Sequence, residues 1–414
     1  MRPEPIFVLG GAQTDFARNF AREGVELVDV IDEVAHAALA DARVDPAFVE
    51  TAHVGNFTAE LFCRQGQLGG LLAMVDPAFA GLPIGRHEAA CASGSIATLA
   101  ATAELEAGRY STALVVGVEQ MRNVPGATAA EYIGGPAMWS GHEATDVEFP
   151  WPHQFSLLAD EYERRYGLDE EHLRAIARLN FDNARRNPLA QTRSWRFDER
   201  SFTDDEHANP VIEGRIRKQD CGQITDGAAA VVLARADRAA EWAAERGVDL
   251  DEVPRITGFG HRTMPITLEA KLKASAESPY VFPHVRAAFC DALGRAGLAD
   301  VHELDLVEVH DCFTSTEYMT IDHMGLTDPG RSFEAIEEGV IAFDGPLPVN
   351  PSGGLIGLGH PVGATGVRML NDARRQVAQV AGEIQVDGAR RAGTLNIGGS
   401  ATTVVSFVVE AGAT

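Results

Sequence analysis

The sequence predicts an α/β fold in which layers of helices cover a mixed β-sheet. Short β-branched, apolar runs alternate along the chain with segments of helical periodicity. This alternation appears twice, and the second series begins near residue 254. A stretch at about 120–220, rich in Arg, Asn, Pro, Trp and His, interrupts the first series and is interpreted as an inserted loop domain. We therefore expect an N-terminal half at 1–252, which carries this insertion, and a C-terminal half at 253–414.

The first half supplies four strand candidates and three helix candidates. The apolar runs predict buried strands because they are short and bounded by glycine or polar residues. The helical segments place Ala, Leu and Ile on one face. The expected strands lie at 6–11, 52–55, 113–119 and 228–234, and the expected helices at 26–43, 92–107 and, within the insertion, 170–186.

The second half repeats this order, and in both halves chemically capable residues follow a strand. Cys91 has this position in the first half, and His310 and Cys312 have it in the second. Open α/β sheets usually bind ligands beyond the carboxyl ends of their strands, so we expect these residues to converge. The expected strands lie at 254–260, 304–310, 393–399 and 402–410, and the expected helices at 280–296, 312–324 and 362–381.

Composition and charge exclude several classes of protein. A net charge of −25 argues against a nucleic-acid-binding protein and against attraction to an anionic membrane. The five cysteines are scattered, without metal-ligand spacing, so neither a disulfide framework nor a metal site is expected. No signal-peptide pattern or membrane-spanning run is present. We therefore expect a cytoplasmic protein with free thiols.

Cys91 begins the segment CASGSIATLAA, in which small residues allow a helix to start close against neighbouring backbone. A thiol at a helix N-terminus lies at the positive end of the helix dipole, which favours the thiolate. A free cysteine is often simply buried. The position at a helix start favours a nucleophile over a structural residue here.

Three further motifs contain candidate site residues. The glycine-rich segment NPSGGLIGLGHPVGATG, residues 350–366, predicts a loop that approaches another group closely and holds His360, a candidate base. HDCF at 310–313 offers His310 as a hydrogen-bond donor and Cys312 as a proton carrier. In NIGGSATTVV, at 396–405, the backbone around Asn396 and Gly398 could supply N–H groups for an oxyanion hole.

CASG, HDCF, GGLIGLGHPVGATG and NIGGS, in this order and spacing, resemble the thiolase superfamily. The resemblance covers essentially the whole chain, including DCGQITDGAAAVVLA at 220–234. It implies a thiolase-like fold: two fused βαβαβαββ halves, layered, with a loop domain inserted in the first. It also implies a homodimer or homotetramer.

The resemblance implies a role for each site residue. Cys91 corresponds to the acyl-accepting nucleophile and His360 to the histidine that activates it. The N–H groups of Cys91 and Gly398 correspond to the oxyanion hole. Many thiolases carry a second catalytic cysteine where this chain has Asn396. HDCF resembles the sterol-carrier-protein-2 type, in which its cysteine is the acid/base; Cys312 would take that role, and His310 would stabilise the enolate.

The expected reaction is thiolytic cleavage of a 3-ketoacyl-CoA in lipid or fatty acid metabolism, or the reverse condensation. Coenzyme A thioesters would be substrates, and no permanently bound cofactor is expected. The chain end also resembles thiolases that act with an OB-fold partner. A ketosynthase, a retro-aldolase and a non-catalytic acyl-CoA-binding protein are the alternatives. The cations considered for the coenzyme A phosphates, each more simply a solvated surface charge, are Arg185, Arg186, the RIRK segment at 215–218, Lys271 and Lys273.

Overall fold

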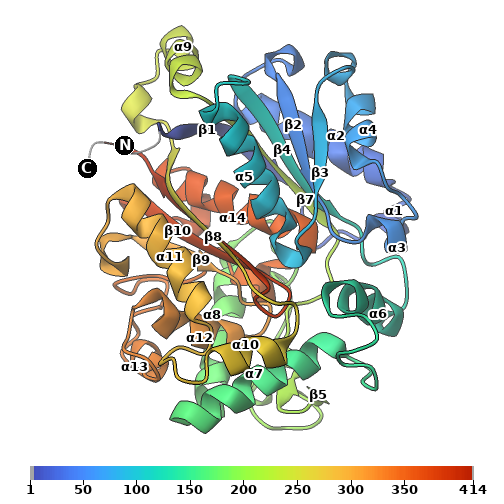
Figure 1. Ribbon diagram of the computed structural model, residues 1–414, viewed down its shortest axis with the longest axis vertical. Coiled ribbons are helices and arrows are strands. Elements are labelled where there is room, and N and C mark those ends of the chain that lie inside the picture. Colours follow the sequence, from blue (N-terminus) through green and yellow to red (C-terminus); the bar gives the residue numbers. More distant parts are fainter. Residues whose placement is uncertain (1–3, 413–414) are drawn as a thin grey trace.

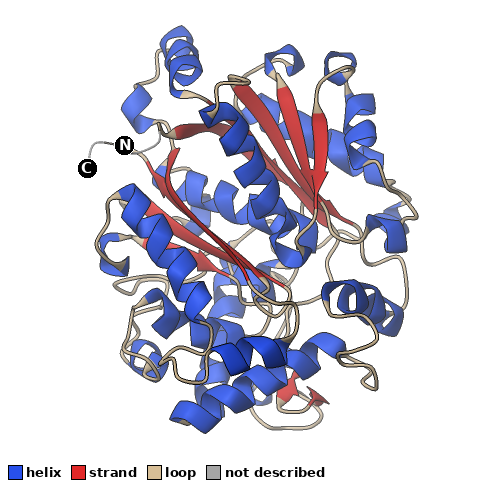
Figure 2. Cartoon of the chain, viewed as in Figure 1, coloured by secondary structure: helices blue, strands red, loops and turns tan. Residues whose placement is uncertain are grey.

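A computed structural model describes residues 4–412, whose main feature is a nine-stranded mixed sheet with helices on both faces (Figures 1 and 2). The strand order is β3-β2-β4-β7-β1-β8-β11-β10-β9. A separate two-stranded hairpin lies within the insertion. The strands are β1 (Ile6–Gln13), β2 (Thr51–Gly55), β3 (Ile84–His87), β4 (Thr112–Glu119), β5 (Val211–Glu213), β6 (Ile216–Arg217), β7 (Gly227–Ala234), β8 (Arg255–Thr263), β9 (Leu306–Val309), β10 (Arg391–Gly398) and β11 (Thr403–Glu410).

The two halves of the chain contribute opposite ends of the large sheet and repeat one strand pattern. They meet where β1 and β8 pair, Ile6 with Ile256 and Phe7 with Arg255. In the first half β1 and β4 are antiparallel to β7, and β2 is parallel to β4. In the second half β8 and β10 are antiparallel to β11, and β9 is parallel to β10. The predicted layered α/β fold is confirmed, including each predicted strand to within a few residues.

Two helices lie between the halves and position the site. α5 (Ser93–Glu106) packs on β2 and β4, whereas α14 (Val362–Val377) contacts β4 and β7 of one half and β10 and β11 of the other. Outside them, α2 (Leu27–Asp41) covers β1 and β7, and α11 (Pro283–Ala296) covers β8 and β11 (Figure 1). Both inner helices begin near the same end of the sheet, so their N-termini can share one site.

Glycines allow the inner helices to lie very close to each other and to the sheet. A Cβ atom on Gly117 of β4 would stand 2.6 Å from the carbonyl oxygen of Gly363 in α14. A Cβ atom on Gly94 of α5 would stand 2.8 Å from the same oxygen. Real Cβ atoms do not approach that closely, so any larger residue at these positions would push α14 away.

The insertion contains more helix than the sequence predicts. The expected helix at 170–186 is confirmed as α8 (Glu170–Arg186), but α6 (Gly126–Ala137) and α7 (Pro150–Tyr166) were not predicted. α6 contains Pro136 and three glycines, and α7 has two prolines in its first turn, so neither has a clear helical signature. The short edge strand β3 was missed as well.

The other helices are short, with at most 11 residues each. No helix within residues 4–412 is both long and apolar enough to cross a membrane. The domain boundary near residue 252 stays a prediction. These helices are α1 (Phe20–Glu23), α3 (Ala59–Phe62), α4 (Leu68–Val75), α9 (Ala236–Arg246), α10 (Leu268–Ala274), α12 (Thr314–Met324) and α13 (Ser332–Glu337).

Gly117→Ala is expected to destabilise the protein by about 1–3 kcal/mol, because its methyl group would overlap α14. Gly294→Ala in α11 is the matched control, since a Cβ atom there meets no neighbour within 4 Å. That control should be neutral or stabilising by up to about 1 kcal/mol, because alanine is the better helix former. Urea unfolding of both variants measures the difference. Equal stabilities would contradict the close packing.

Candidate active site

Cys91 lies in a single 3₁₀ turn, Ala90–Ala92, directly before α5. Ala90 adopts φ +49°, a strained conformation for a residue with a Cβ atom. Ser93 stabilises the turn, because its Oγ accepts from the N–H of Ala89 at 2.9 Å and donates to the carbonyl of Ala90 at 2.6 Å. The turn therefore holds Cys91 at the helix N-terminus that the sequence predicts.

His360 lies between the glycine-rich segment, which forms a π-helical turn at Gly354–Leu358, and the start of α14. Its backbone N–H donates to Thr225 Oγ1 at 2.9 Å, and its Nδ1 lies 2.7 Å from Thr365 Oγ1. The hydroxyl of Thr365 donates to the carbonyl of Pro361 at 3.1 Å, so Oγ1 accepts from Nδ1–H. Nε2 of His360 is consequently a lone-pair acceptor.

His310 follows β9, and its ring contacts a side chain of the neighbouring strand β10. Its Nδ1 lies 3.1 Å from Nδ2 of Asn396 in β10, and Oδ1 of Asn396 accepts from Ser95 Oγ in α5 at 2.8 Å. The rings of His310 and His360 are nearly perpendicular, at 85°, with centroids 5.2 Å apart. Asn396, which the sequence predicts as a backbone residue of the oxyanion hole, therefore contacts a site histidine through its side chain.

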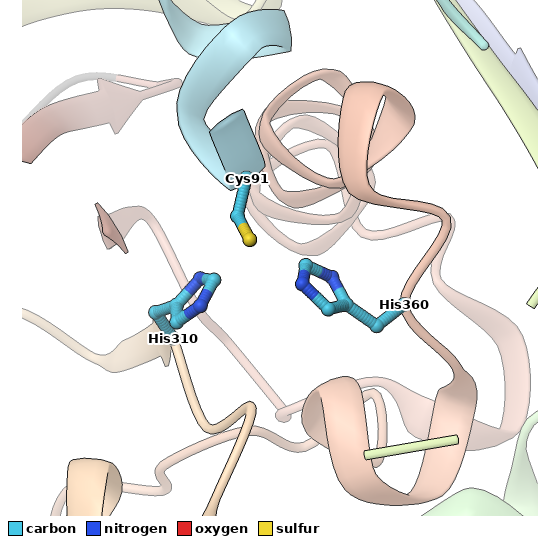
Figure 3. Close-up of side chains that lie close together, drawn as sticks. All are labelled: Cys91, His310 and His360. Atoms are coloured by element: carbon cyan, nitrogen blue, oxygen red, sulfur yellow. The ribbon is translucent and has the colours of Figure 1, made fainter. Parts of the chain in front are cut away.

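Cys91, His310 and His360 converge on one point from three separate segments (Figure 3). One ligand-type atom from each lies within 4.8 Å of the others, and all three residues are buried. Neither histidine Nε2 has a hydrogen-bond partner among residues 4–412. A thiol and two imidazoles could also bind a soft metal ion, but no carboxylate belongs to this set. These two nitrogens are therefore available to form hydrogen bonds with a bound substrate.

All of these groups are neutral at rest. Burial raises the pKa of Cys91 to about 12, although the N–H groups of Gly399 and of Cys91 itself lower it. Burial, reinforced by the charge of Arg368, lowers the pKa of His360 to about 3. Burial also holds the pKa of His310 well below its usual value and that of Cys312 well above. The sequence suggested a thiolate at this helix start. The raised pKa of Cys91 favours the thiol instead, because burial raises the pKa by more than the two N–H groups lower it.

An apolar cavity of about 240 Å³ opens over Cys91 and His360. Cys312 and Gly399 also line it, while Asn396 and Gly398 lie buried beneath. The N–H group directed at the Cys91 sulfur belongs to Gly399, one residue beyond the predicted donor Gly398. The apolar lining comes chiefly from the insertion and from neighbouring loops: Met121, Ile133, Phe149, Trp151, Phe155, Ile224, Phe313 and Val362.

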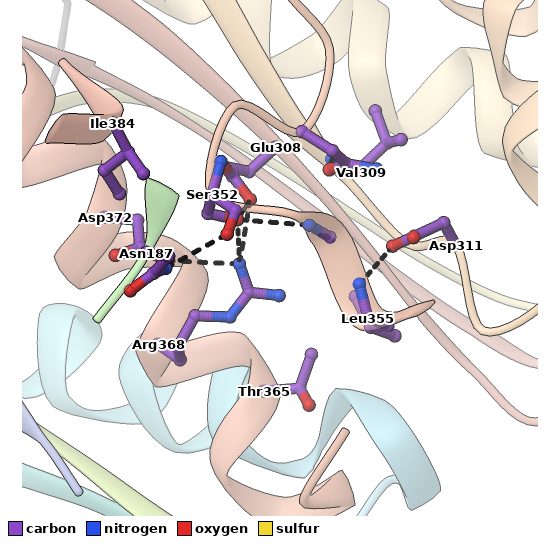
Figure 4. A network of polar contacts seen from close by, with 12 residues as sticks. Asn187, Glu308, Val309, Asp311, Ser352, Leu355, Thr365, Arg368, Asp372 and Ile384 are labelled. Carbon is purple, nitrogen blue, oxygen red and sulfur yellow. Dashed lines mark hydrogen bonds and ion pairs between the residues drawn. The ribbon is translucent and has the colours of Figure 1, made fainter. Parts of the chain in front are cut away.

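A buried ion cluster lies behind the site and joins its segments (Figure 4). Nη1 of Arg368 in α14 lies 2.8 Å from Glu308 of β9, 3.2 Å from Asp372 and 3.2 Å from Ser352 of the glycine-rich segment. These side chains are almost fully inaccessible to solvent. The cluster thus connects the residues next to His310 with the helix that follows His360. The sequence analysis did not predict this cluster; the i, i+4 spacing of Arg368 and Asp372 is the signal that could have indicated it.

A second set of buried carboxyls extends this cluster. Asp311 Oδ2 accepts from the N–H of Ile356 at 3.1 Å and shares the amide of Asn180 with Glu317. Burial, and next the charge of Asp311, raise the pKa of Glu317 to about 8. Glu317 is therefore protonated at neutral pH in the folded protein.

The cations proposed for coenzyme A phosphates do not gather at the cavity. Arg215 pairs with Asp160 and Glu163, Arg217 with Glu206, and Arg185 with Asp182. Arg186 stacks over Phe343. Lys271 is not a solvated surface charge: it is buried, and its Nζ donates to Ile266 O and Ser400 Oγ, both at 2.8 Å.

The buried convergence of Cys91, His310 and His360 beneath an apolar cavity, on a duplicated α/β fold, has the geometry of an enzyme active site. The chain belongs to the thiolase family. Residues 6–237 match the thiolase N-terminal domain, and residues 269–411 match the family described as thiolase C-terminal domain-like.

Similar proteins agree with this assignment. An acetyl-CoA acetyltransferase of Methanothermobacter thermautotrophicus is 32% identical over 97% of this chain and 98% of its own length. Human sterol carrier protein 2 is 27% identical over 97% of this chain and 71% of its own. Among solved structures, an Ltp2–ChsH2(DUF35) aldolase has a TM-score of 0.75 at 19% identity, covering 99% of both chains. An acetyl-CoA acetyltransferase from Syntrophomonas wolfei has a TM-score of 0.65 at 20% identity, covering 98% of this chain and 99% of its own.

Alkylation of Cys91 by iodoacetamide should accelerate about tenfold per pH unit from pH 7 to 9, without a plateau, because the raised pKa leaves little thiolate. Peptide mass spectrometry measures the rate, and the exposed Cys290 serves as an internal control for accessible thiols. A plateau below pH 8 would instead indicate a resting thiolate–imidazolium pair.

Glu317→Gln should flatten the loss of stability between about pH 4.5 and pH 8. The pKa of Glu317 is raised from 4.5 to about 8 in the folded protein, so its stabilising contribution is complete below about pH 4.5 and is lost progressively until the pH reaches about 8. Glutamine does not titrate and removes that slope. The melting temperature measured against pH gives the comparison, with Glu383→Gln at an exposed position as control. Parallel curves for wild type and Glu317→Gln would contradict a protonated Glu317.

Proposed function

We propose that this enzyme catalyses thiolytic cleavage of 3-ketoacyl-CoA to acetyl-CoA and a shortened acyl-CoA, or the reverse condensation, through an acyl-Cys91 intermediate. The convergence of the Cys91 thiol with the unpaired Nε2 atoms of His310 and His360, beneath an apolar cavity, is the observation that carries the proposal. The full-length similarity to acetyl-CoA acetyltransferases supports the same reaction.

In the first step, Nε2 of His360 accepts the proton of Cys91 as the sulfur attacks the 3-keto carbon. The hydrogen bond from Nδ1 to Thr365 leaves Nε2 free to act as this base. Because both groups are neutral at rest, charge forms only when a substrate carbonyl is present to take it. We assign stabilisation of the resulting oxyanion to backbone N–H groups of Cys91 and of the Gly398–Gly399 turn; the N–H groups of Gly399 and Cys91 directed at the sulfur support this assignment.

In the second step, the bond between C2 and C3 breaks and the electron pair becomes an acetyl-CoA enolate. In this scheme the thioester oxygen lies between His310 and the now protonated His360, which stabilise its charge; the proximity of the two rings supports this role. Cys312, which lines the same cavity, donates its proton to C2. The thiol of coenzyme A then gives its proton to the Cys312 thiolate and attacks the acyl-Cys91 thioester. Cys91 leaves as a thiolate and takes its proton back from His360 as the shortened acyl-CoA departs.

Coenzyme A thioesters are the substrates in this scheme, and no permanently bound cofactor takes part. One solved thiolase of the same fold, human mitochondrial 3-ketoacyl-CoA thiolase, is described in complex with CoA. We further propose that the enzyme is a cytoplasmic homodimer or homotetramer that does not bind nucleic acid or membranes.

A second candidate is a retro-aldolase or acyl transferase that requires an accessory protein. The similarity in fold to an aldolase that contains a DUF35 component favours this candidate. A retro-aldol cleavage would not need an acyl-accepting thiol, so the placement of Cys91 beside a histidine base favours the thiolase reaction. A non-catalytic acyl-CoA-binding protein would have no use for either histidine.

Incubation with acetyl-CoA should add one acetyl group to wild-type protein and none to Cys91→Ala, because only Cys91 lies beside a free base. Cys312→Ser should retain acetylation but lose at least about 10²-fold of acetoacetyl-CoA cleavage, since a general acid is weakened. Intact-protein mass and loss of acetoacetyl-CoA absorbance measure the two effects. Cys290→Ser, an exposed position, is the matched control.

The proposal fails if neither short nor long acyl thioesters modify Cys91. Acetylation without cleavage in the wild type would favour an acyl transferase, and activity that appears only with an added DUF35 protein would favour the partner-dependent enzyme.

A further inference from the structure

Asn396 is the residue of the site that the thiolase reaction does not by itself explain. It is 1% exposed and lies on β10 between two polar side chains of other elements. On one side is Ser95 of α5, and on the other is His310, which follows β9. Its amide has both a donor and an acceptor, so its orientation can impose a direction on the whole chain of hydrogen bonds.

That direction follows from the serine. The hydroxyl of Ser95 donates to Oδ1 of Asn396 at 2.8 Å, which leaves the amide hydrogens of Nδ2 directed toward Nδ1 of His310 at 3.1 Å. Nδ1 must then be the acceptor. Because the pKa of His310 lies well below its usual value, the ring is neutral and carries one hydrogen. That hydrogen is on Nε2, the atom without a protein partner in the site.

We propose that Asn396 is a positioning residue that fixes His310 as the Nε2–H tautomer and so makes it a permanent hydrogen-bond donor at the site. The role of the His310 donor, which is to stabilise the enolate oxygen, rests on the proposed function. The two histidines then have opposite polarity at rest: His310 donates through Nε2, whereas His360 accepts through Nε2. One stabilises the developing negative charge while the other removes the proton of Cys91.

The direct test is the tautomer itself. Protein labelled with ¹⁵N-histidine gives separate long-range correlations for the two ring nitrogens, and His310→Gln identifies the His310 signals. We expect Nε2 of His310 to carry hydrogen in the wild type. Hydrogen on Nδ1 would overturn the inference. This measurement does not depend on activity, so it can succeed even if the proposed reaction fails.

Asn396→Asp supplies the functional test. A carboxylate at this position accepts from Nδ1–H, so the neutral ring would present a lone pair at Nε2. Loss of one oxyanion donor predicts a fall in kcat of about 10²–10³-fold at high pH with little change in KM. The new carboxylate also raises the pKa of His310, and the imidazolium again has Nε2–H, so activity should partly recover as pH falls.

That acid recovery separates tautomer control from structural damage, which would lower activity at every pH. Cys91 should still become acetylated in Asn396→Asp, because the first step does not use His310. Ser95→Ala is the matched conservative variant: it leaves the amide in place but frees its orientation, so a smaller loss of about tenfold is expected. A uniform loss in Asn396→Asp with an unchanged tautomer would overturn the inference.

Discussion

The buried guanidinium of Arg368 is the constraint on which the site depends. It has no access to solvent, and its charge is balanced by Glu308 and Asp372 (Figure 4). Removing one partner of such a cluster would leave an uncompensated buried charge, which typically costs about 3–5 kcal/mol. Since Glu308 precedes His310 by two residues and Arg368 follows His360 by eight, the ion cluster fixes the distance between the two histidines.

A buried carboxyl and a close contact between glycines position the Cys91 turn in a similar way. Glu119, at the end of β4, accepts from the N–H groups of Phe57 and Gly363, both at 3.0 Å, and so joins the first half of the sheet to the start of α14. The glycine contact between Gly94 and Gly363 then brings α5, and with it the Cys91 turn, against α14. Buried carboxyls thus hold α14 against both halves of the sheet, and glycines allow α5 to approach it closely. Together these contacts accompany the convergence of ligand atoms from Cys91, His310 and His360 within 4.8 Å of one another.

The sequence predicted the main strands, the inner helices and the residues Cys91, His310 and His360, because short apolar runs and glycine-framed motifs are local signals. It did not predict α6 and α7, whose prolines and glycines obscure their periodicity. It also suggested a thiolate at Cys91, since dipole arguments consider one helix, whereas desolvation depends on everything packed around the sulfur. The sequence also did not predict the contacts of Thr225 and Thr365 with His360 or of Ser95 with Asn396. A single small hydroxyl residue forms no recognisable sequence pattern, and its partner can lie far away in the chain.

A neutral site has a consequence for selectivity. A preformed thiolate in an open cavity would react with any electrophile that entered, whereas a thiol with a pKa of about 12 gains nucleophilicity only as its proton moves to His360. That transfer creates an imidazolium in a cavity with an apolar lining, which is favourable only when a substrate oxygen develops compensating negative charge nearby. The apolar walls therefore do more than accept an acyl chain. They make activation of Cys91 conditional on a polarised carbonyl, so the same burial that suppresses the resting thiolate couples its formation to the presence of the correct substrate.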